Sequence, residues 1–248
     1  TMKICIIKLG AKGDVVRTLP LLLSIKEKYP NSEITWITKP SSKEILETSP
    51  YIDKILTLPI NPTELGSFNT LYNLDIEPAA SLLATKIKSE KKYGFYLDQG
   101  YPAALNFPAE YYLNTLFDDE LKKTNTKTYQ QIMFDAAELP YKNQHHPIFL
   151  TEQDKQYAQD FINQNNLNQE RLIGIHIGSS NRWPSKKWHL DNIKEFIIKA
   201  KNKGYEILLF SGPDEKNYLK PLIENLEDQE IKIHLNNPEN SDKEFFSL

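Results

Sequence analysis

The chain has 248 residues and a formal net charge of −3, and 40% of its residues are apolar and 25% charged. This composition suits a globular protein with two hydrophobic cores and excludes an intrinsically disordered chain. The acidic balance provides no general attraction for nucleic acid, so we expect no nucleic-acid partner and only a local anion site.

Compartment and membrane contact can be judged from cysteine usage and apolar run length. The single cysteine, Cys5, excludes an intrachain disulfide and favours a reducing compartment. The longest apolar runs fall far short of the roughly 20 residues that span a bilayer, and the N-terminus lacks the apolar core of a signal peptide. We therefore expect a cytoplasmic monomer, and the sequence leaves open a peripheral contact with the inner face of the cytoplasmic membrane.

The first half of the sequence alternates between apolar runs and amphipathic stretches. Residues 3–9 are almost continuously apolar, which is typical of a strand buried on both faces of a parallel sheet. Helical spacing then runs from Val15 to Tyr29, where Pro20 predicts a kink or a restart at Thr18. This βαβ alternation predicts a parallel sheet with right-handed crossovers. Further strands are predicted over residues 33–38, 52–58, 70–74 and 93–97, and helices over 41–48, 78–88, 110–121 and 128–139.

The alternation begins afresh after a polar stretch, residues 141–147, which is the predicted linker. The expected domains are therefore residues 1–147 and 148–248. The last segment has a capping box, Ser241 with Glu244, and the chain ends about one turn later. We expect an incomplete second domain, because a three-stranded sheet with an unfinished helix leaves apolar faces uncovered. The predicted helices of this half cover residues 151–165, 187–201 and 214–226, and the strands 172–177, 206–210 and 231–234.

Strand-to-helix loops are the places to search for chemistry, because open α/β sheets bind ligands at the carboxyl ends of their strands. The first loop, residues 10–14, offers two glycines and Asp14 at a helix start. Asp14 either caps the helix or has a catalytic role, and this loop taken alone favours the cap. The loop has neither the Gly-x-Gly-x-x-Gly pattern of a dinucleotide site nor the Gly-Lys-Ser/Thr of a P-loop.

The second loop, residues 178–188, combines a Gly-Ser-Ser turn with positive charge from Arg182, Lys186 and Lys187. Backbone N–H groups, hydroxyls and a guanidinium are the groups that bind a diphosphate. The alternative is a solvated basic turn whose tryptophans pack.

The third loop runs from Phe210 to Glu215. Glu215 either favours a helix N-terminus through its charge or accepts a hydrogen bond from a sugar hydroxyl. The five histidines have no carboxylates at ligand spacing, so we expect neither a metal nor a cofactor.

At these loops the sequence resembles a known family. Residues 3–20, with Gly10-Ala11-Lys12-Gly13-Asp14 at their centre, resemble the opening of the lipopolysaccharide heptosyltransferase family, glycosyltransferase family 9. The resemblance implies a GT-B fold, in which two Rossmann-like, doubly wound domains face a cleft. The first domain would hold mainly the acceptor and the second the nucleotide-sugar. Three later segments resemble the family's second-domain signatures and follow one another in the same order. They are His176-Ile177-Gly178-Ser179-Ser180, Arg182-Trp183-Pro184 with Trp188, and Ser211-Gly212-Pro213-Asp214-Glu215.

The resemblance also implies roles for single residues. Asp14 matches the family's catalytic base, and Ser179 and Ser180 match its diphosphate-binding pair. The family commonly has a lysine shortly before the Trp-Pro pair, where this chain has Arg182 as the expected substitute. A later Asp-Ser/Thr and His motif of the family has no counterpart before the last residue of this chain. The expected donor-side residues are Ser179, Ser180, Arg182, Lys186 and Glu215, and the expected acceptor-side residues are Lys12, Gly13, Lys39 and Asp75.

The expected function is that of an inverting, metal-independent glycosyltransferase. It would move a heptose-like sugar from a nucleotide-sugar, with ADP-heptose as the expected donor, to a lipopolysaccharide-core or related glycan or glycolipid. Asp14 would take the proton of the acceptor hydroxyl, with Asp75 or Glu77 as the next candidates for the base. The alternatives are a GT-B-like nucleotide-sugar epimerase, a non-catalytic nucleotide-sugar binding protein and, as a weaker option, an NAD-linked enzyme.

Overall fold

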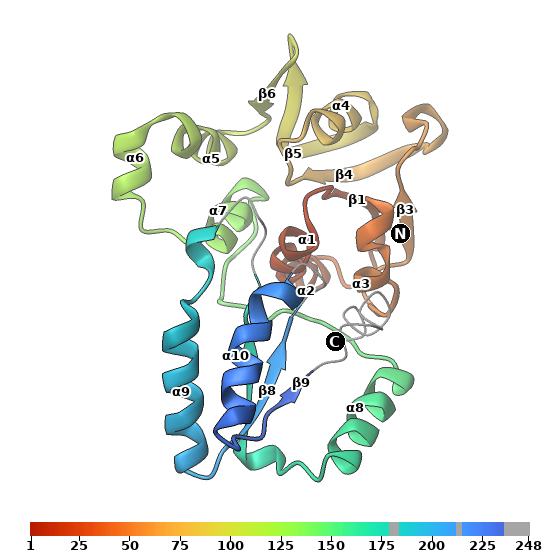
Figure 1. The fold of residues 1–248 in the computed structure, drawn as a ribbon. Coiled ribbons are helices and arrows are strands. Elements are labelled where there is room, and N and C mark those ends of the chain that lie inside the picture. The colour runs from red at the N-terminus through yellow and green to blue at the C-terminus, as the bar shows by residue number, and fades with distance from the viewer. Residues whose placement is uncertain (179–183, 212–214, 236–248) are drawn as a thin grey trace. The chain divides into compact units, whose positions relative to one another are not determined.

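The structure is a computed structural model that describes residues 1–178, 184–211 and 215–235 (Figure 1). The chain divides into two compact units, Thr1–Phe149 and Leu150–Leu248. The boundary predicted from the sequence, after residue 147, lies two residues earlier. Phe149 is tied to the first unit, because Thr48 Oγ1 donates a hydrogen bond of 2.7 Å to its carbonyl oxygen.

The first unit is built on a six-stranded sheet with the strand order β3-β2-β1-β4-β5-β6. The first five strands run parallel, and β6 pairs antiparallel with β5. The strands are β1 (Lys3–Ile7), β2 (Glu33–Thr38), β3 (Lys54–Thr57), β4 (Ser67–Asn73), β5 (Lys88–Asp98) and β6 (Tyr101–Ala104). The α-helices are α1 (Lys12–Thr18), α2 (Pro20–Lys28), α3 (Lys43–Glu47), α4 (Pro78–Lys86), α5 (Phe107–Phe117), α6 (Asp119–Thr124) and α7 (Tyr129–Ala136), with short 3-10 helices η1 (Pro40–Ser42) and η2 (Pro62–Glu64).

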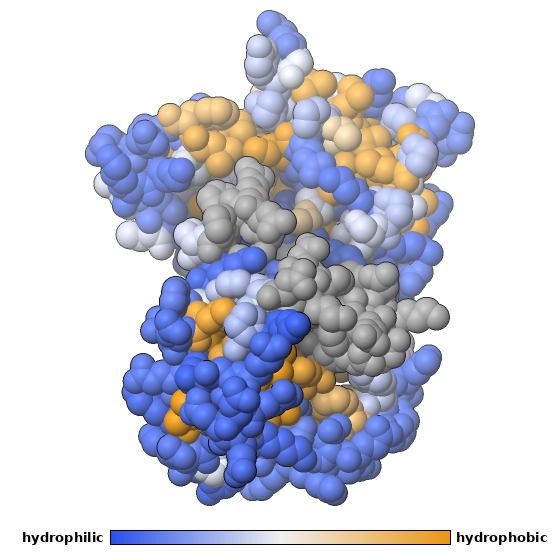
Figure 2. All heavy atoms as spheres, viewed as in Figure 1, coloured by the Kyte–Doolittle hydropathy of each residue, from blue (hydrophilic) through white to orange (hydrophobic). Residues whose placement is uncertain are grey.

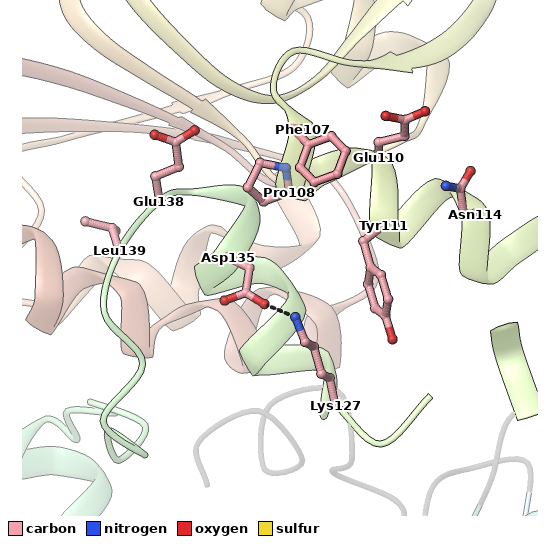
Figure 3. Close-up of a pocket in the computed structure, with 9 residues that line it drawn as sticks. All are labelled: Phe107, Pro108, Glu110, Tyr111, Asn114, Lys127, Asp135, Glu138 and Leu139. Carbon is pink, nitrogen blue, oxygen red and sulfur yellow. Dashed lines mark hydrogen bonds and ion pairs between the residues drawn. The ribbon is translucent and has the colours of Figure 1, made fainter. Parts of the chain in front are cut away.

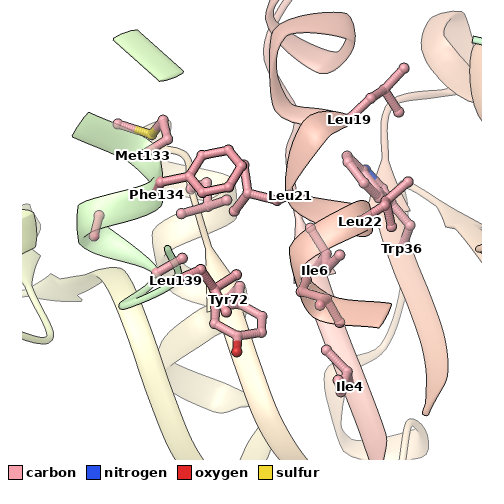
Figure 4. Close-up of a cluster of buried hydrophobic side chains, with 14 of the residues drawn as sticks. Ile4, Ile6, Leu19, Leu21, Leu22, Trp36, Tyr72, Met133, Phe134 and Leu139 are labelled. Carbon is pink, nitrogen blue, oxygen red and sulfur yellow. The ribbon is translucent and has the colours of Figure 1, made fainter. Parts of the chain in front are cut away.

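Alternate residues of β1 enter two separate hydrophobic cores. Ile4 and Ile6 pack in a cluster with side chains of α2 and α7, shown in Figure 4. Cys5 and Ile7 pack in a second cluster with side chains of α4. Each buried aliphatic side chain of this size contributes about 1.5–3 kcal/mol relative to exposure. The predicted burial of this strand on both faces is confirmed, since all four residues are 0% exposed.

Pro20 divides the first helical stretch into α1 and α2, so the predicted break is confirmed. The second helix restarts at Pro20 itself rather than at Thr18. The first position of a helix needs no N–H donor and suits the fixed φ of proline.

The predicted strand over residues 93–97 is only part of β5, and β6 was not predicted. Gln99 and Gly100 both have positive φ, 47° and 89°, and they form a two-residue turn between Asp98 and Tyr101. Two consecutive positive φ values are typical of the type I′ turn, whose twist matches that of a hairpin. β5 begins earlier than predicted because its polar first residues pair with β4, from Ser67 onward.

The single helix predicted over residues 110–121 is two helices, α5 and α6. Asp118 separates them, because its side chain accepts hydrogen bonds from the N–H groups of Glu120 and Leu121. A side chain that caps a new helix in this way favours a break over a continuous helix.

The second unit has a parallel three-stranded sheet with the order β7-β8-β9. Its core contains Ile193 and Ile197 of the helix before β8 and Leu222 and Leu226 of the helix after it. The helix predicted near residues 241–246 lies outside the described residues. The elements are α8 (Glu152–Gln164), η3 (Gln169–Arg171), β7 (Leu172–His176), η4 (Pro184–Lys186), α9 (Leu190–Asn202), β8 (Glu206–Phe210), α10 (Lys216–Asp228) and β9 (His234–Leu235).

Candidate functional site

The carboxyl end of β1 lies where the sheet of the first unit reverses its strand order. From β1 the chain passes to β2 and β3 on one side and then crosses to β4 and β5 on the other. In open α/β sheets the strand ends at such a switch point are the usual place for a ligand. Three loops meet here: residues 8–11 after β1, the loop with Lys39 after β2, and the loop with Asp75 after β4. The other two residues expected on the acceptor side, Lys12 and Gly13, begin α1 at the end of the first loop.

Asp14 stands in the first turn of α1, directly after β1. The residue at the N-cap is Ala11, whose side chain has no polar atom, so the reading of Asp14 as a simple cap is wrong. Arg17, one turn later, donates a hydrogen bond from Nη2 to Asp14 Oδ1. The Asp14 side chain is 35% exposed, which leaves its carboxylate accessible to a substrate hydroxyl.

Gly10 makes room for the Asp14 side chain. A Cβ atom at residue 10 would lie 2.9 Å from Asp14 Cβ and 3.0 Å from Asp14 Oδ2. A Cβ at Gly13 would instead meet no atom of the described residues within 4 Å. Glycine inside a helix costs about 1 kcal/mol relative to alanine. Packing within the chain therefore explains why residue 10 is glycine, but it does not explain why residue 13 is.

Tyr129, the first residue of α7, joins Arg17 to Lys8. The guanidinium carbon of Arg17 lies 3.9 Å from the centre of the Tyr129 ring, a cation–π contact. Lys8 Nζ donates a hydrogen bond of 2.9 Å to the Tyr129 hydroxyl, which comes 121 residues later in the sequence. A capping box between Thr128 and Gln131 fixes the start of α7 and with it the position of Tyr129. The sequence patterns did not indicate a role for Tyr129.

Asp75 and Lys8 form a buried ion pair beneath the loop that follows β1. Each residue is 5% exposed, and Lys8 Nζ lies 3.5 Å from Asp75 Oδ2. The same oxygen accepts hydrogen bonds from the backbone N–H groups of Leu9 and Gly10, at 2.9 and 2.8 Å. The other oxygen accepts one from the N–H of Glu77, at 2.9 Å. Asp75 therefore orients the loop from inside the fold, which differs from the direct acceptor contact that we expected of it.

Lys8 is a functional candidate that the sequence patterns did not single out. Burial by itself lowers the pKa of its ammonium group, but Tyr129, Asp75 and Asp14 outweigh burial and raise the pKa above its ordinary value. Its Nζ also donates a hydrogen bond of 2.8 Å to the carbonyl oxygen of Leu74. The available signal was a lysine at the end of an apolar strand, since a buried lysine needs specific partners.

The other acceptor-side residues lie around the same strand ends. Lys39, after β2, forms an ion pair of 2.8 Å with Glu77, before α4, across the strand end of β1 between them. Both side chains are more than a third exposed, so the pair contributes only about 0–1 kcal/mol and can exchange for a ligand. Lys12 begins α1, and burial lowers its pKa while Glu44 opposes this shift.

Of the residues expected on the donor side, the described part of the second unit includes Glu215 and Lys186. Glu215 is the N-cap of α10 and is 6% exposed, and its Oε1 lies 3.9 Å from Lys187 Nζ. A Cβ atom at Gly178 would lie 2.9 Å from Glu215 Cδ, so this carboxylate packs against the end of β7. Lys186 ends η4 and is exposed. The remaining expected donor residues, Ser179, Ser180 and Arg182, lie outside the described residues.

The sequence also matches a known family. The sequence model of glycosyltransferase family 9 (heptosyltransferase) matches residues 66–235, more than half of the chain. The chain belongs to this family. Lipopolysaccharide core heptosyltransferase OpsX of Haemophilus influenzae is 33% identical to this family 9 chain over 103 residues. The match covers 37% of the chain and 29% of OpsX, so the matched segment spans less than a third of that relative's length.

Two solved structures have the same fold as this family 9 chain. The glycosyltransferase family 9 protein of Veillonella parvula superposes with a TM-score of 0.74 at 20% identity, over 96% of this chain and 69% of that protein. ADP-heptose lipopolysaccharide heptosyltransferase II of Escherichia coli superposes with a TM-score of 0.63 at 18% identity, over 99% of this chain and 76% of that protein. The predicted α/β fold of the GT-B heptosyltransferases is thereby confirmed.

Within residues 1–178, 184–211 and 215–235 of the family 9 chain, His, Cys, Asp and Glu side chains form no group of three that could hold a metal ion. In the same part of the chain, every helix is too short or too polar to cross a bilayer.

Proposed function

We propose that this chain transfers a heptose-like sugar from a nucleotide-sugar to a lipopolysaccharide-core or related glycan acceptor, with inversion at the anomeric carbon. Family membership and the name of the Haemophilus relative, a lipopolysaccharide core heptosyltransferase, support the reaction class. The name of the Escherichia coli protein of the same fold supports ADP-heptose as the first donor to test. The observation that carries the proposal is the carboxylate of Asp14, partly exposed at the switch point of the first unit.

Asp14 is the proposed general base. Its carboxylate takes the proton from an acceptor hydroxyl while the hydroxyl oxygen forms a bond to the anomeric carbon of the donor. The bond from that carbon to the β-phosphate oxygen breaks, and the nucleoside diphosphate leaves with the bonding electrons. Attack from the face opposite the diphosphate inverts the anomeric configuration. A positioned base of this kind accelerates transfer by about 10²–10⁴-fold.

The acceptor side of this proposal divides into contact and positioning residues. Gly13 leaves open space next to Asp14, and Lys12 and Lys39 supply positive charge to an anionic acceptor. Asp75 acts through the loop that it anchors. Replacing Gly13 by alanine should raise the stability of α1 by up to about 1 kcal/mol and still slow transfer, because the added methyl group occupies acceptor space. Urea denaturation and steady-state kinetics on the same variant measure the two effects.

The donor side rests on residues of the second unit. Ser179, Ser180, Arg182 and Lys186 are proposed to bind the diphosphate, whose negative charge grows as it leaves. Glu215 is proposed to accept a hydrogen bond from a donor hydroxyl. Its position beside the ends of β7 and β8 supports this role, because doubly wound domains bind nucleotides at those ends.

The decisive experiment compares Asp14→Asn with the unchanged protein. The assay combines ADP-heptose with a lipid A–Kdo acceptor and follows the acceptor by mass spectrometry, since transfer makes it heavier and epimerisation leaves it unchanged. We expect Asp14→Asn to lower kcat by about 10²–10⁴-fold while the donor Kd stays within about twofold. Glu47→Gln is the matched control, because Glu47 forms a similar half-exposed helical ion pair with Lys43.

The outcome also separates Asp14 from its rival. If Asp14→Asn keeps most of the transferase rate while it binds donor, and Glu77→Gln loses that rate, then Glu77 is the base and the proposed role of Asp14 is wrong. An unchanged acceptor mass with a changed sugar nucleotide would replace transfer by epimerisation.

A further inference from the structure

A pocket of about 520 Å³ lies between α5 and α7 of the first unit (Figure 3). Its walls come from the first two turns of α5 and from the segment that runs from Lys127 through α7 to Leu139. Pockets for small ligands have volumes of roughly 300–1,000 Å³, so this one has the size of a ligand site. The lining residues differ from those that surround Asp14.

Two aromatic side chains form the apolar wall of the pocket. Phe107 begins α5 and is 85% exposed, and Figure 2 shows apolar side chains gathered over this helix. Burial of such a side chain is worth about 1.5–3 kcal/mol, which contact with a ligand can supply. Tyr111, one turn later, is held in a fixed orientation. Its hydroxyl donates a hydrogen bond of 2.7 Å to Asn125 Oδ1, and Lys127 Nζ lies 4.9 Å from its ring centre.

Charged side chains form the polar part of the pocket. Glu110, Asp135 and Glu138 contribute three negative charges and Lys127 one positive charge, which leaves the lining with two net negative charges. Lys127 Nζ donates a hydrogen bond of 2.7 Å to Asp135, and Asn106 Nδ2 donates one of 3.0 Å to Glu138. A carboxylate accepts about four hydrogen bonds, so both groups retain capacity for further donors.

We propose that this pocket binds a neutral saccharide. A sugar ring has a face of C–H groups, which packs against an aromatic ring, and an edge of hydroxyl groups, which donate hydrogen bonds to carboxylates. Phe107 and Tyr111 provide the aromatic contacts, and the carboxylates provide the acceptors. The net negative charge of the lining repels phosphorylated or carboxylated sugars, so the chemistry selects an uncharged sugar unit.

The pocket adjoins the surroundings of Asp14 through its two helices. Tyr112, the neighbour of Tyr111 on α5, packs edge-on against Tyr129 of α7, with 6.2 Å between ring centres. Tyr129 in turn contacts both Lys8 and Arg17. A neutral sugar unit of an acceptor glycan, joined to the anionic part near Lys12 and Lys39, can thus be held by the same unit. Assignment of the pocket to the acceptor rests on the proposed function, whereas saccharide binding itself does not.

Sugar binding is tested by saturation-transfer difference NMR and calorimetry, with lactose and methyl α-mannoside as neutral probes and glucuronate as the charged probe. We expect the neutral probes to bind and glucuronate to bind at least about fivefold more weakly, because it meets the negative lining. Phe107→Ala should weaken the binding of the neutral probes by about tenfold. Phe117→Ala is the matched control, since Phe117 ends the same helix, is 82% exposed and lies outside the pocket lining. Its effect should stay within about twofold.

The proposal is overturned if none of the probes gives a saturation-transfer signal, if glucuronate binds as well as the neutral sugars, or if the two phenylalanine variants lose binding equally. Glu110→Gln provides a second variant on an exposed residue. It should weaken the binding of the neutral probes and reduce the difference in affinity between these probes and glucuronate. Saccharide binding is measured without a donor, and transfer is measured by the mass of the acceptor. Failure of the transferase proposal and failure of the saccharide pocket are therefore distinguishable.

Discussion

Replacement of Asp75 by alanine is expected to destabilise the first unit by about 3–5 kcal/mol, the range for removal of one partner from a buried ion pair. The substitution leaves the Lys8 ammonium at 5% exposure without its carboxylate. It also removes the acceptor of three backbone N–H groups, those of Leu9, Gly10 and Glu77. Domains are stable by only about 5–15 kcal/mol, so this loss is a large fraction of the total.

Replacement of Lys8 by methionine should cost less, about 1–2 kcal/mol, because Asp75 keeps its three backbone donors. The two substitutions should not be additive. Once Lys8 is methionine, loss of Asp75 no longer leaves an unpaired buried cation. The loss of unfolding free energy in the double variant should therefore be smaller than the sum of the two single losses by about 1–3 kcal/mol.

Urea denaturation followed by tryptophan fluorescence measures these differences. Trp36 is fully buried in the first unit, and the other two of the three tryptophans, Trp183 and Trp188, are replaced by phenylalanine in every variant so that Trp36 alone reports. Glu47→Ala, which breaks a half-exposed surface pair, is the control and should cost at most about 1 kcal/mol. The reasoning fails if Asp75→Ala costs no more than this control or if the two substitutions are additive.

Three further predictions concern other parts of the fold. Gly94→Ala should destabilise the first unit by about 2–5 kcal/mol in the same assay, because Gly94 has φ +93° and a Cβ there would lie 1.8 Å from the Asn73 carbonyl oxygen. Stability of the second unit should fall as the pH drops through about 6.5, since burial and Lys232 lower the pKa of His234 in the folded state and protonation then favours the unfolded chain. His234→Gln should remove this part of the pH dependence of the urea midpoint, measured with Trp36 and Trp183 replaced by phenylalanine so that Trp188, which contacts Phe196 of α9, reports on the second unit. Cys5 is fully buried, which raises the pKa of its thiol, so a disulfide reagent should label it only as the first unit unfolds, and rapid labelling of the native protein would contradict this.

Local sequence was enough to predict the elements whose side-chain pattern fits only one kind of secondary structure. β2 and β8 begin and end at the predicted residues, because each is a short, mostly apolar run of residues that favour strands, bounded by turn residues. The break at Pro20 follows from the missing N–H of proline and needs no partner elsewhere. The position of Asp14 at the start of a helix after Gly10 was likewise readable from neighbouring residues.

Elements that depend on a partner strand were not predictable in this way. The first residues of β5, from Lys88 to Lys92, are mostly charged, and they are a strand because they pair with the first residues of β4. β6 exists because the turn at Gln99 and Gly100 folds it back onto β5. Strand propensity reflects the contacts that a residue makes in its sheet more than an intrinsic preference of its backbone.

The sequence by itself thus determined which residue is the candidate base and that both faces of β1 are apolar. Only the tertiary structure decided what surrounds that base. The alternation of side chains along a strand sets the face of each residue, but it does not determine which strand lies alongside. The strand order places Asp75, after β4, beneath the loop that follows β1, and packing of α7 brings Tyr129 to Lys8 across 121 residues. These contacts are made between segments far apart in the chain, so they follow from the packing of the whole unit and not from any local pattern.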